Sequence, residues 1–88
     1  MRIVVCVKQV YDPKSIRLSR SREQLDMRSA VKITNRPDRY ALEAALRLRK
    51  AVGGEIIALT LGDADAEDTA HEAVAIGADR AILLSGPE

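Results

Sequence analysis

The chain has 88 residues, a net charge of +1, one cysteine and two tyrosines as its only aromatic residues. This length allows at most one small domain built on Ala, Val, Ile and Leu, and the charge favours no particular partner. One cysteine excludes an internal disulfide and a Cys-based zinc site, and it fits a reducing cytoplasm. The apolar run after Met1 is too short for a signal peptide or a membrane span, so we expect a soluble, cytoplasmic protein.

The first predicted element is a strand over residues 2–10, which contains the longest apolar run of the chain at residues 3–7. A continuous apolar run is typical of a strand covered on both faces, normally at the centre of a parallel sheet. Lys8 and Gln9 add polar groups at its carboxyl end, where open parallel sheets bind ligands. The pattern therefore predicts that the five apolar residues 3–7 lie in the core and that a candidate binding site follows directly after them.

Residues 14–39 are strongly basic, with eight Lys or Arg against three Asp or Glu, a balance of +5. A solvated surface is the simpler interpretation, and docking of an acidic group is the alternative. Nucleic acid is not expected, because no aromatic residue lies between Tyr11 and Tyr40. Residues 16–18 and 31–33 alternate apolar and polar, which predicts a loose antiparallel arm, with a mobile loop as the alternative.

Residues 35–38, Asn-Arg-Pro-Asp, form a helix start, because Asn or Asp can cap and Pro fits the first turn. The helix is expected over residues 39–52, with Leu42, Ala45 and Leu46 on its buried side. Two glycines follow it and end it.

A strand over residues 55–61, a helix over 63–76 and a strand over 81–84 complete the chain. Asp63 or Asp65 is expected to cap this helix. Its sheet-facing stripe is expected to consist of small residues, namely Ala66, Ala70, Ala73 and Val74.

The alternation of strands and helices predicts an α/β fold with a mostly parallel sheet. Because no helix follows the last strand, we expect the fold to continue beyond Glu88.

The chain shows no nucleophile–base pair, and His71 is expected to face solvent on its helix. The acidic residues 63–68 have the composition of a metal site, but helix capping explains them and no His or Cys assists. Neither the dinucleotide fingerprint nor a P-loop is present. Any nucleotide would therefore be held through its base and ribose rather than its phosphates.

Four segments point together to a known family: residues 4–10 (VVCVKQV), Asn35 with Asp38, residues 41–48 (ALEAALRL) and residues 73–84 (AVAIGADRAILL). In this order they resemble the amino-terminal part of the β subunit of electron transfer flavoprotein. The first two segments are closer to its bifurcating or nitrogen-fixation-associated branch. Two departures are Arg36, which separates Asn35 from Pro37 where the family usually has Asn-Pro, and Tyr11, where close relatives often have Pro.

The resemblance implies a Rossmann-like three-layer α/β/α fold, of which residues 1–88 form a single adenine-nucleotide-binding-type domain, the amino-terminal portion of a longer family domain. It implies an electron carrier without bond-making catalytic residues that holds AMP or FAD and pairs with a flavin-bearing α subunit. A dehydrogenase or ferredoxin-linked protein would be the redox partner. The family's phosphate-binding segment and partner-recognition loop lie downstream, so these 88 residues alone are expected to bind nucleotide weakly.

By the same resemblance, the family's adenosine contacts fall on the end of the first strand, on residues 35–38 and on the end of the second long strand. The predicted cofactor-binding residues are Cys6, Val7, Lys8, Asn35, Asp38, Leu61 and Gly62. Simpler interpretations stand beside this one: Cys6 as a small buried strand residue, Lys8 as a solvated charge, Asn35 as a helix cap and Leu61 as core.

Two other functions remain open at this point. One is a stand-alone adenine-nucleotide-binding domain of the universal stress type, although such domains need a later Gly-rich phosphate motif that this chain lacks. The other is a structural interaction domain that binds no nucleotide.

Overall fold

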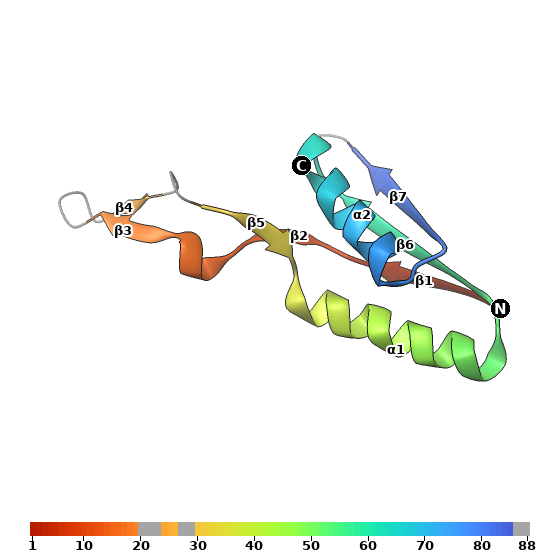
Figure 1. Ribbon diagram of the computed structural model, residues 1–88. Helices are drawn as coiled ribbons and strands as arrows, with labels where there is room; N and C mark the ends of the chain where they lie inside the picture. The colour runs from red at the N-terminus through yellow and green to blue at the C-terminus, as the bar shows by residue number, and fades with distance from the viewer. Residues whose placement is uncertain (20–23, 27–29, 86–88) are drawn as a thin grey trace.

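The computed structural model describes residues 1–19, 24–26 and 30–85, with side chains described for residues 1–16 and 30–85. A parallel sheet with two helices forms one end, and an arm of paired strands extends away from it (Figure 1), so that the chain is elongated, 56 × 25 × 17 Å. The strands are β1 (Arg2–Cys6), β2 (Gln9–Tyr11), β3 (Arg17–Ser19), β4 (Gln24–Asp26), β5 (Lys32–Thr34), β6 (Glu55–Leu61) and β7 (Arg80–Leu84). The helices are α1 (Arg36–Val52) and α2 (Glu67–Ile76), with 3₁₀ turns η1 (Pro13–Ser15) and η2 (Ala64–Ala66).

The sheet contains three parallel strands in the order β1-β6-β7. Its register aligns Val4 with Ile57 and Cys6 with Leu59, and then Leu59 with Ile82. The α/β class and the parallel sheet are therefore confirmed. The first strand was predicted at the centre of the sheet; among the described residues, however, the central strand is β6, with a neighbour on each side, and β1 pairs with β6 alone.

The first strand also ends earlier than predicted. Pairing with β6 closes at Val7, whose N–H donates to the Leu59 carbonyl at 2.9 Å. The next N–H, that of Lys8, turns away and donates to the Asp38 carboxylate at 2.8 Å. The predicted strand over residues 2–10 is thus two strands, β1 in the sheet and β2 in the arm.

The arm is antiparallel, as predicted, but its pairing differs from the prediction. Residues 31–33 were expected opposite 16–18; instead β5 pairs with β2, and β3 pairs with β4. The partner of β5 is the short strand β2, which the prediction had largely merged into the strand over residues 2–10 and which local alternation did not indicate.

Both helices pack on the same face of the sheet (Figure 1), and one core joins them. It contains residues of β1, α1, β6 and α2 together with one residue just after β1 and one just before β7, namely Val5, Val7, Leu42, Ala45, Ile56, Ala58, Ala73 and Ala78. Burial of Leu42 and Ala45 confirms the predicted inner side of α1, and Leu46 is partly buried. The helix begins at Arg36, three residues before the predicted start, because Pro37 fits its first turn.

The second helix also differs in detail from its prediction. Asp63 caps the 3₁₀ turn η2, where its carboxylate accepts from the Asp65 N–H at 3.0 Å, and α2 follows from Glu67. Val74 was predicted to face the sheet but is exposed, and Thr69 is buried in its place. His71 is exposed, as expected.

The other face of the sheet is uncovered in the part of the chain that the structure describes. Its outward side chains include Val4, 55% exposed, and Leu84, 49% exposed. Of the expected three layers, the described residues therefore form two, a sheet and one helical layer. No described helix has the length and apolar character needed to span a membrane.

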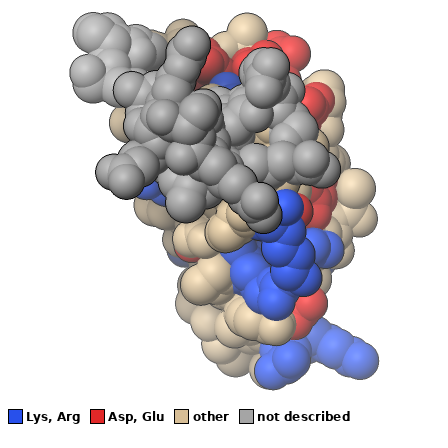
Figure 2. All heavy atoms as spheres, turned by 90° about the vertical axis from the view of Figure 1, so that its left-hand side faces the viewer, with Lys and Arg blue, Asp and Glu red and all other residues tan. Residues whose placement is uncertain are grey.

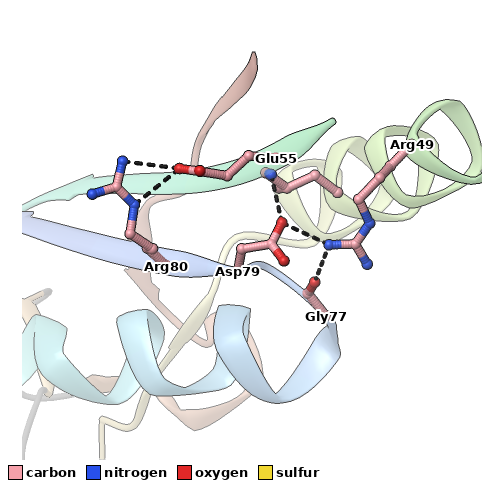
Figure 3. A network of polar contacts seen from close by, with 6 residues as sticks. Arg49, Glu55, Gly77, Asp79 and Arg80 are labelled. Atoms are coloured by element: carbon pink, nitrogen blue, oxygen red, sulfur yellow. Dashed lines mark hydrogen bonds and ion pairs between the residues drawn. The ribbon is translucent and has the colours of Figure 1, made fainter. Parts of the chain in front are cut away.

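A polar network ties α1 to the start of β7 (Figure 3). The Asp79 carboxylate accepts from the Ile56 N–H at 2.7 Å and from the Arg49 guanidinium at 2.8 Å. The backbone N–H of Ile56, and then Arg49, hold the pKa of Asp79 below its usual range. Beside it, Arg80 and Glu55 form an ion pair at 2.9 Å between β7 and β6.

Candidate functional site

A pocket of about 810 Å³ lies where β1, β6 and β7 end at their carboxyl termini. It is lined by strand ends and by the start of α1, namely Cys6, Val7, Lys8, Asn35, Asp38, Leu59, Leu61 and Leu84. Its size is within the range of small-molecule sites. The carboxyl edge of an open parallel sheet is also where such folds bind ligands.

Six of the seven predicted site residues line this pocket, although they come from three separate parts of the sequence. Two of the simpler interpretations are wrong: Cys6 is exposed rather than buried, and Leu61 is 65% exposed rather than core. Asn35 occupies the cap position of α1, yet its side chain makes no capping hydrogen bond. Its amide is therefore not committed to the helix.

Leu59 and Leu84 also line the pocket, and the sequence reasoning missed both. Leu59 lies two residues before Leu61 on the same face of β6, and Leu84 lies opposite Leu61 on β7. Because side chains alternate along a strand, Leu59 could have been predicted to lie on the same face as Leu61. Leu84 required the register between β6 and β7, which a single sequence does not give.

Two backbone hydrogen bonds build the polar wall of the pocket. The Lys8 N–H donates to one Asp38 carboxylate oxygen at 2.8 Å, and the Asn35 N–H donates to the Lys8 carbonyl at 2.7 Å. These bonds lock the end of β1 against the start of α1. They hold the Asp38 carboxylate and the Asn35 amide at the pocket, beside the apolar strand ends.

Gly62, the seventh predicted residue, does not line this pocket but a smaller one next to it, of about 410 Å³. Lys8 and Leu61 line both pockets, so the two adjoin. A Cβ atom on Gly62 would lie 2.9 Å from the Ala66 Cβ. Close packing of the η2 turn on the end of β6 therefore explains this glycine without any ligand.

Of the two lysines that line the smaller pocket, Lys8 and Lys32, Lys32 is already paired. Its ammonium lies 3.1 Å from the Asp65 carboxylate and 3.6 Å from that of Asp63. The hydrogen bond to Asp65 raises the pKa of Lys32 above its usual value. The carboxylates at this turn would also repel a phosphate, in keeping with the missing phosphate loop.

The donor set of the larger pocket fits the adenosine part of a nucleotide. Apolar side chains from three strand ends offer flat contact for a base. The Asn35 amide can both donate and accept hydrogen bonds, and the Asp38 carboxylate accepts from hydroxyl or amino groups. None of the pocket residues forms a nucleophile–base pair.

A family model of the electron transfer flavoprotein domain matches residues 24–88. The chain belongs to the electron transfer flavoprotein family.

Curated relatives of this family match along almost the whole chain. Protein FixA of Azorhizobium caulinodans is 46% identical over 97% of the chain and 30% of its own length. The electron transfer flavoprotein subunit beta of Thermoanaerobacterium thermosaccharolyticum is 39% identical over 97% of the chain and 33% of its own length. The acryloyl-CoA reductase electron transfer subunit gamma of Anaerotignum propionicum is 40% identical over the whole chain and 33% of its own length.

These matches confirm the resemblance to the amino-terminal part of the β subunit. The chain spans about a third of the length of the curated relatives it matches.

Proposed function

We propose that the protein is an electron carrier of the β-subunit type and that the larger pocket holds the adenosine part of AMP or FAD. The supporting observation is the convergence of six residues, predicted from separate sequence segments, on one pocket at the carboxyl edge of the sheet. Local helix and strand signals alone would not bring residues from three separate chain segments together in one pocket.

Each wall of the pocket has a distinct part in this proposal. Leu59, Leu61 and Cys6 would contact the faces of the adenine ring, because apolar side chains at strand ends offer dry, flat surfaces. Asn35 and Asp38 would hydrogen-bond to the edge of the base or to the ribose hydroxyls.

FAD, when bound, supplies reversible uptake and release of electrons, whereas AMP would act as a structural ligand. The chain's own residues bind and orient the nucleotide and carry out no bond-making chemistry.

The partners follow from the family. We propose pairing with a flavin-bearing α subunit and electron exchange with a dehydrogenase or a ferredoxin-linked protein in the cytoplasm. Relatives named as the FixA protein and as an electron transfer subunit of acryloyl-CoA reductase support electron transfer in such assemblies. Residues 1–88 would form the amino-terminal portion of a longer nucleotide-binding domain.

Co-expression of the full reading frame with its α subunit tests this function. The pair is expected to purify as a complex that contains flavin and, if the β pocket takes AMP, an additional adenine nucleotide released on denaturation. A colourless complex without adenine nucleotide would contradict the proposal. The variant Leu61→Asp, which puts a charge against the base, is expected to lower the released nucleotide without breaking the complex.

The alternative function, a stand-alone nucleotide-binding domain, predicts a different binding result. Micromolar saturation of the 88-residue chain by AMP would favour that function, whereas weak binding favours a site that is completed elsewhere. No binding of either AMP or FAD to the full pair would favour the structural interaction domain.

A further inference from the structure

The ribbon formed by β2 and β5 has two faces of different character. Its register places Tyr11 opposite Lys32 and Val10 opposite Ile33. Directly opposed residues share a face and successive pairs alternate, so Val10 and Ile33 point away from the face that carries Lys32. We call the face with Lys32 the inner face and the face with Val10 and Ile33 the outer face.

The inner face is held against η2 and α2 by matched polar contacts. Lys32 pairs with Asp65, and the Gln9 amide donates to the Asp65 carbonyl at 2.9 Å. The Thr34 hydroxyl donates to the Glu72 carboxylate at 2.8 Å. The acidic residues of η2 thus pair with Lys32, the basic residue on the inner face of the ribbon. The inner face of the ribbon therefore offers little free charge to a partner.

The outer face lines a groove of about 510 Å³ between the ribbon and the start of α1. It combines apolar residues with two cations, namely Val10, Tyr11, Asp12, Pro13, Lys14, Ile33, Asn35 and Arg36. Ile33 is one of the exposed large hydrophobic residues of the chain, whereas the ring of Tyr11 lies near the Lys32 ammonium on the inner face. The groove therefore presents apolar surface to solvent, whereas the inner face of the ribbon packs against η2 and α2.

The two cations of this groove have no acidic partner among the residues that the structure describes. Lys14 and Arg36 are both exposed. The one carboxylate of the groove, Asp12, is occupied in capping η1, where it accepts from the Lys14 N–H at 3.0 Å. Figure 2, which looks along the arm, shows a group of Lys and Arg side chains in the lower half of the view.

We propose that this outer groove docks an acidic, partly apolar segment of a partner protein. Charge complementarity argues for the acidic part, because Lys32 on the inner face is paired whereas Lys14 and Arg36 of the outer groove have no acidic partner among the described residues. The exposed Ile33, with Val10 opposite it on the same face, argues for apolar side chains between the acids. The groove shares Asn35 with the nucleotide pocket, but Lys14, Arg36 and Ile33 do not line that pocket, so the proposal stands without the proposed function.

The test measures fluorescence anisotropy of a labelled short peptide of alternating Glu and Leu, at about 50 mM salt, where surface charges are weakly screened. The double variant Lys14→Glu/Arg36→Glu is expected to weaken binding about tenfold. Its matched control is Arg47→Glu/Lys50→Glu, which changes net charge equally on the exposed side of α1 and is expected to leave binding within about twofold. Ile33→Ser is expected to weaken binding of the Glu-Leu peptide but not that of an all-Glu peptide.

Three outcomes would overturn the proposal. The first is no binding of the Glu-Leu peptide by the folded chain. The second is equal weakening by the matched control, which would mean that net charge alone acts. The third is tighter binding of oligo-dT or of vesicles with anionic lipids than of the peptide, which would assign the groove to a different class of partner. Circular dichroism of every variant checks that the chain remains folded.

Discussion

The two faces of the sheet are both apolar, yet they have opposite surroundings. On the helix-covered face Ile56 is completely buried and Val5 lies in the core. On the other face, one residue along the same strands, Val4 and Leu84 are about half exposed. The carboxyl end of this uncovered face is also where Leu61 and Leu84 form a wall of the nucleotide pocket.

This difference follows from topology rather than composition. The chain runs from β1 to β6 to β7 in one direction across the sheet, and crossovers between parallel strands are right-handed. Two successive right-handed crossovers in one direction place both helices on one side. Parity therefore decides whether a helix covers an apolar strand residue. On the face without helices, Ile57 is still buried because it lies between Val4 and Arg80 of the neighbouring strands.

The largest expected effect on stability comes from truncating one leucine on each face of the sheet. Leu42→Ala, at the centre of the covered face, is expected to lower the free energy of unfolding by about 2–5 kcal/mol, because it leaves a cavity. Leu84→Ala is expected to cost less than about 1 kcal/mol, since the side chain is half exposed in these 88 residues. Urea unfolding of both variants measures the difference. Equal losses would mean that the second face is covered in solution.

A smaller effect is expected at the turn that joins α1 to β6. Gly54 has φ +124°, and a Cβ atom there would lie 2.2 Å from the Met1 carbonyl oxygen, which accepts from the Glu55 N–H. Gly54→Ala is expected to cost about 2–3 kcal/mol, from backbone strain plus displacement of the first strand. Gly53 is the matched control because its φ is +75° with open space around it, so Gly53→Ala is expected to cost about 1 kcal/mol. Similar thermal midpoints for the two variants would contradict the close approach of Met1.

The third effect depends on pH and concerns the polar network behind the covered face. Because the folded state lowers the pKa of Asp79, its contribution is complete above the unfolded pKa, near 4, and is lost as the pH falls through the folded value. Asp79→Asn is therefore expected to reduce stability at neutral pH, with the difference from the parent chain narrowing below about pH 4. Arg49→Gln is expected to reduce stability less in the Asp79→Asn variant than in the parent chain, because its partner carboxylate is already gone. A difference that is independent of pH would contradict the charge-based explanation.

Much of the fold was predictable from local patterns. Glycines, Pro37 and apolar runs located α1, β6, α2 and β7 to within a few residues. The place of β1 beside β6, with no second neighbour among the described residues, was not predictable. A continuous apolar run indicates two apolar faces, but it does not tell which neighbours the strand has. The break after Cys6 depends on a hydrogen bond from the Lys8 N–H to Asp38, thirty residues away, and no local signal reports it.

The candidate site was predicted only in part, because some of its residues meet through contacts between distant parts of the chain. Asn35 and Asp38 were identified through the family resemblance, and the fold brings them to the end of β1. Leu84 was missed because its place opposite Leu61 depends on strand register. The outer groove of the arm was missed because the partner of β5 is β2, which the sequence pattern had merged with β1.

The measurement that tests the central claim most directly is a titration of the isotopically labelled chain with AMP, followed by amide chemical shifts. Even weak binding is detected in this way. We predict dose-dependent shifts concentrated at Cys6, Val7, Lys8, Asn35, Asp38 and Leu61, and their loss in Leu61→Asp. Shifts confined to other parts of the chain, or none at millimolar AMP, would contradict an adenosine pocket at the carboxyl edge of this sheet.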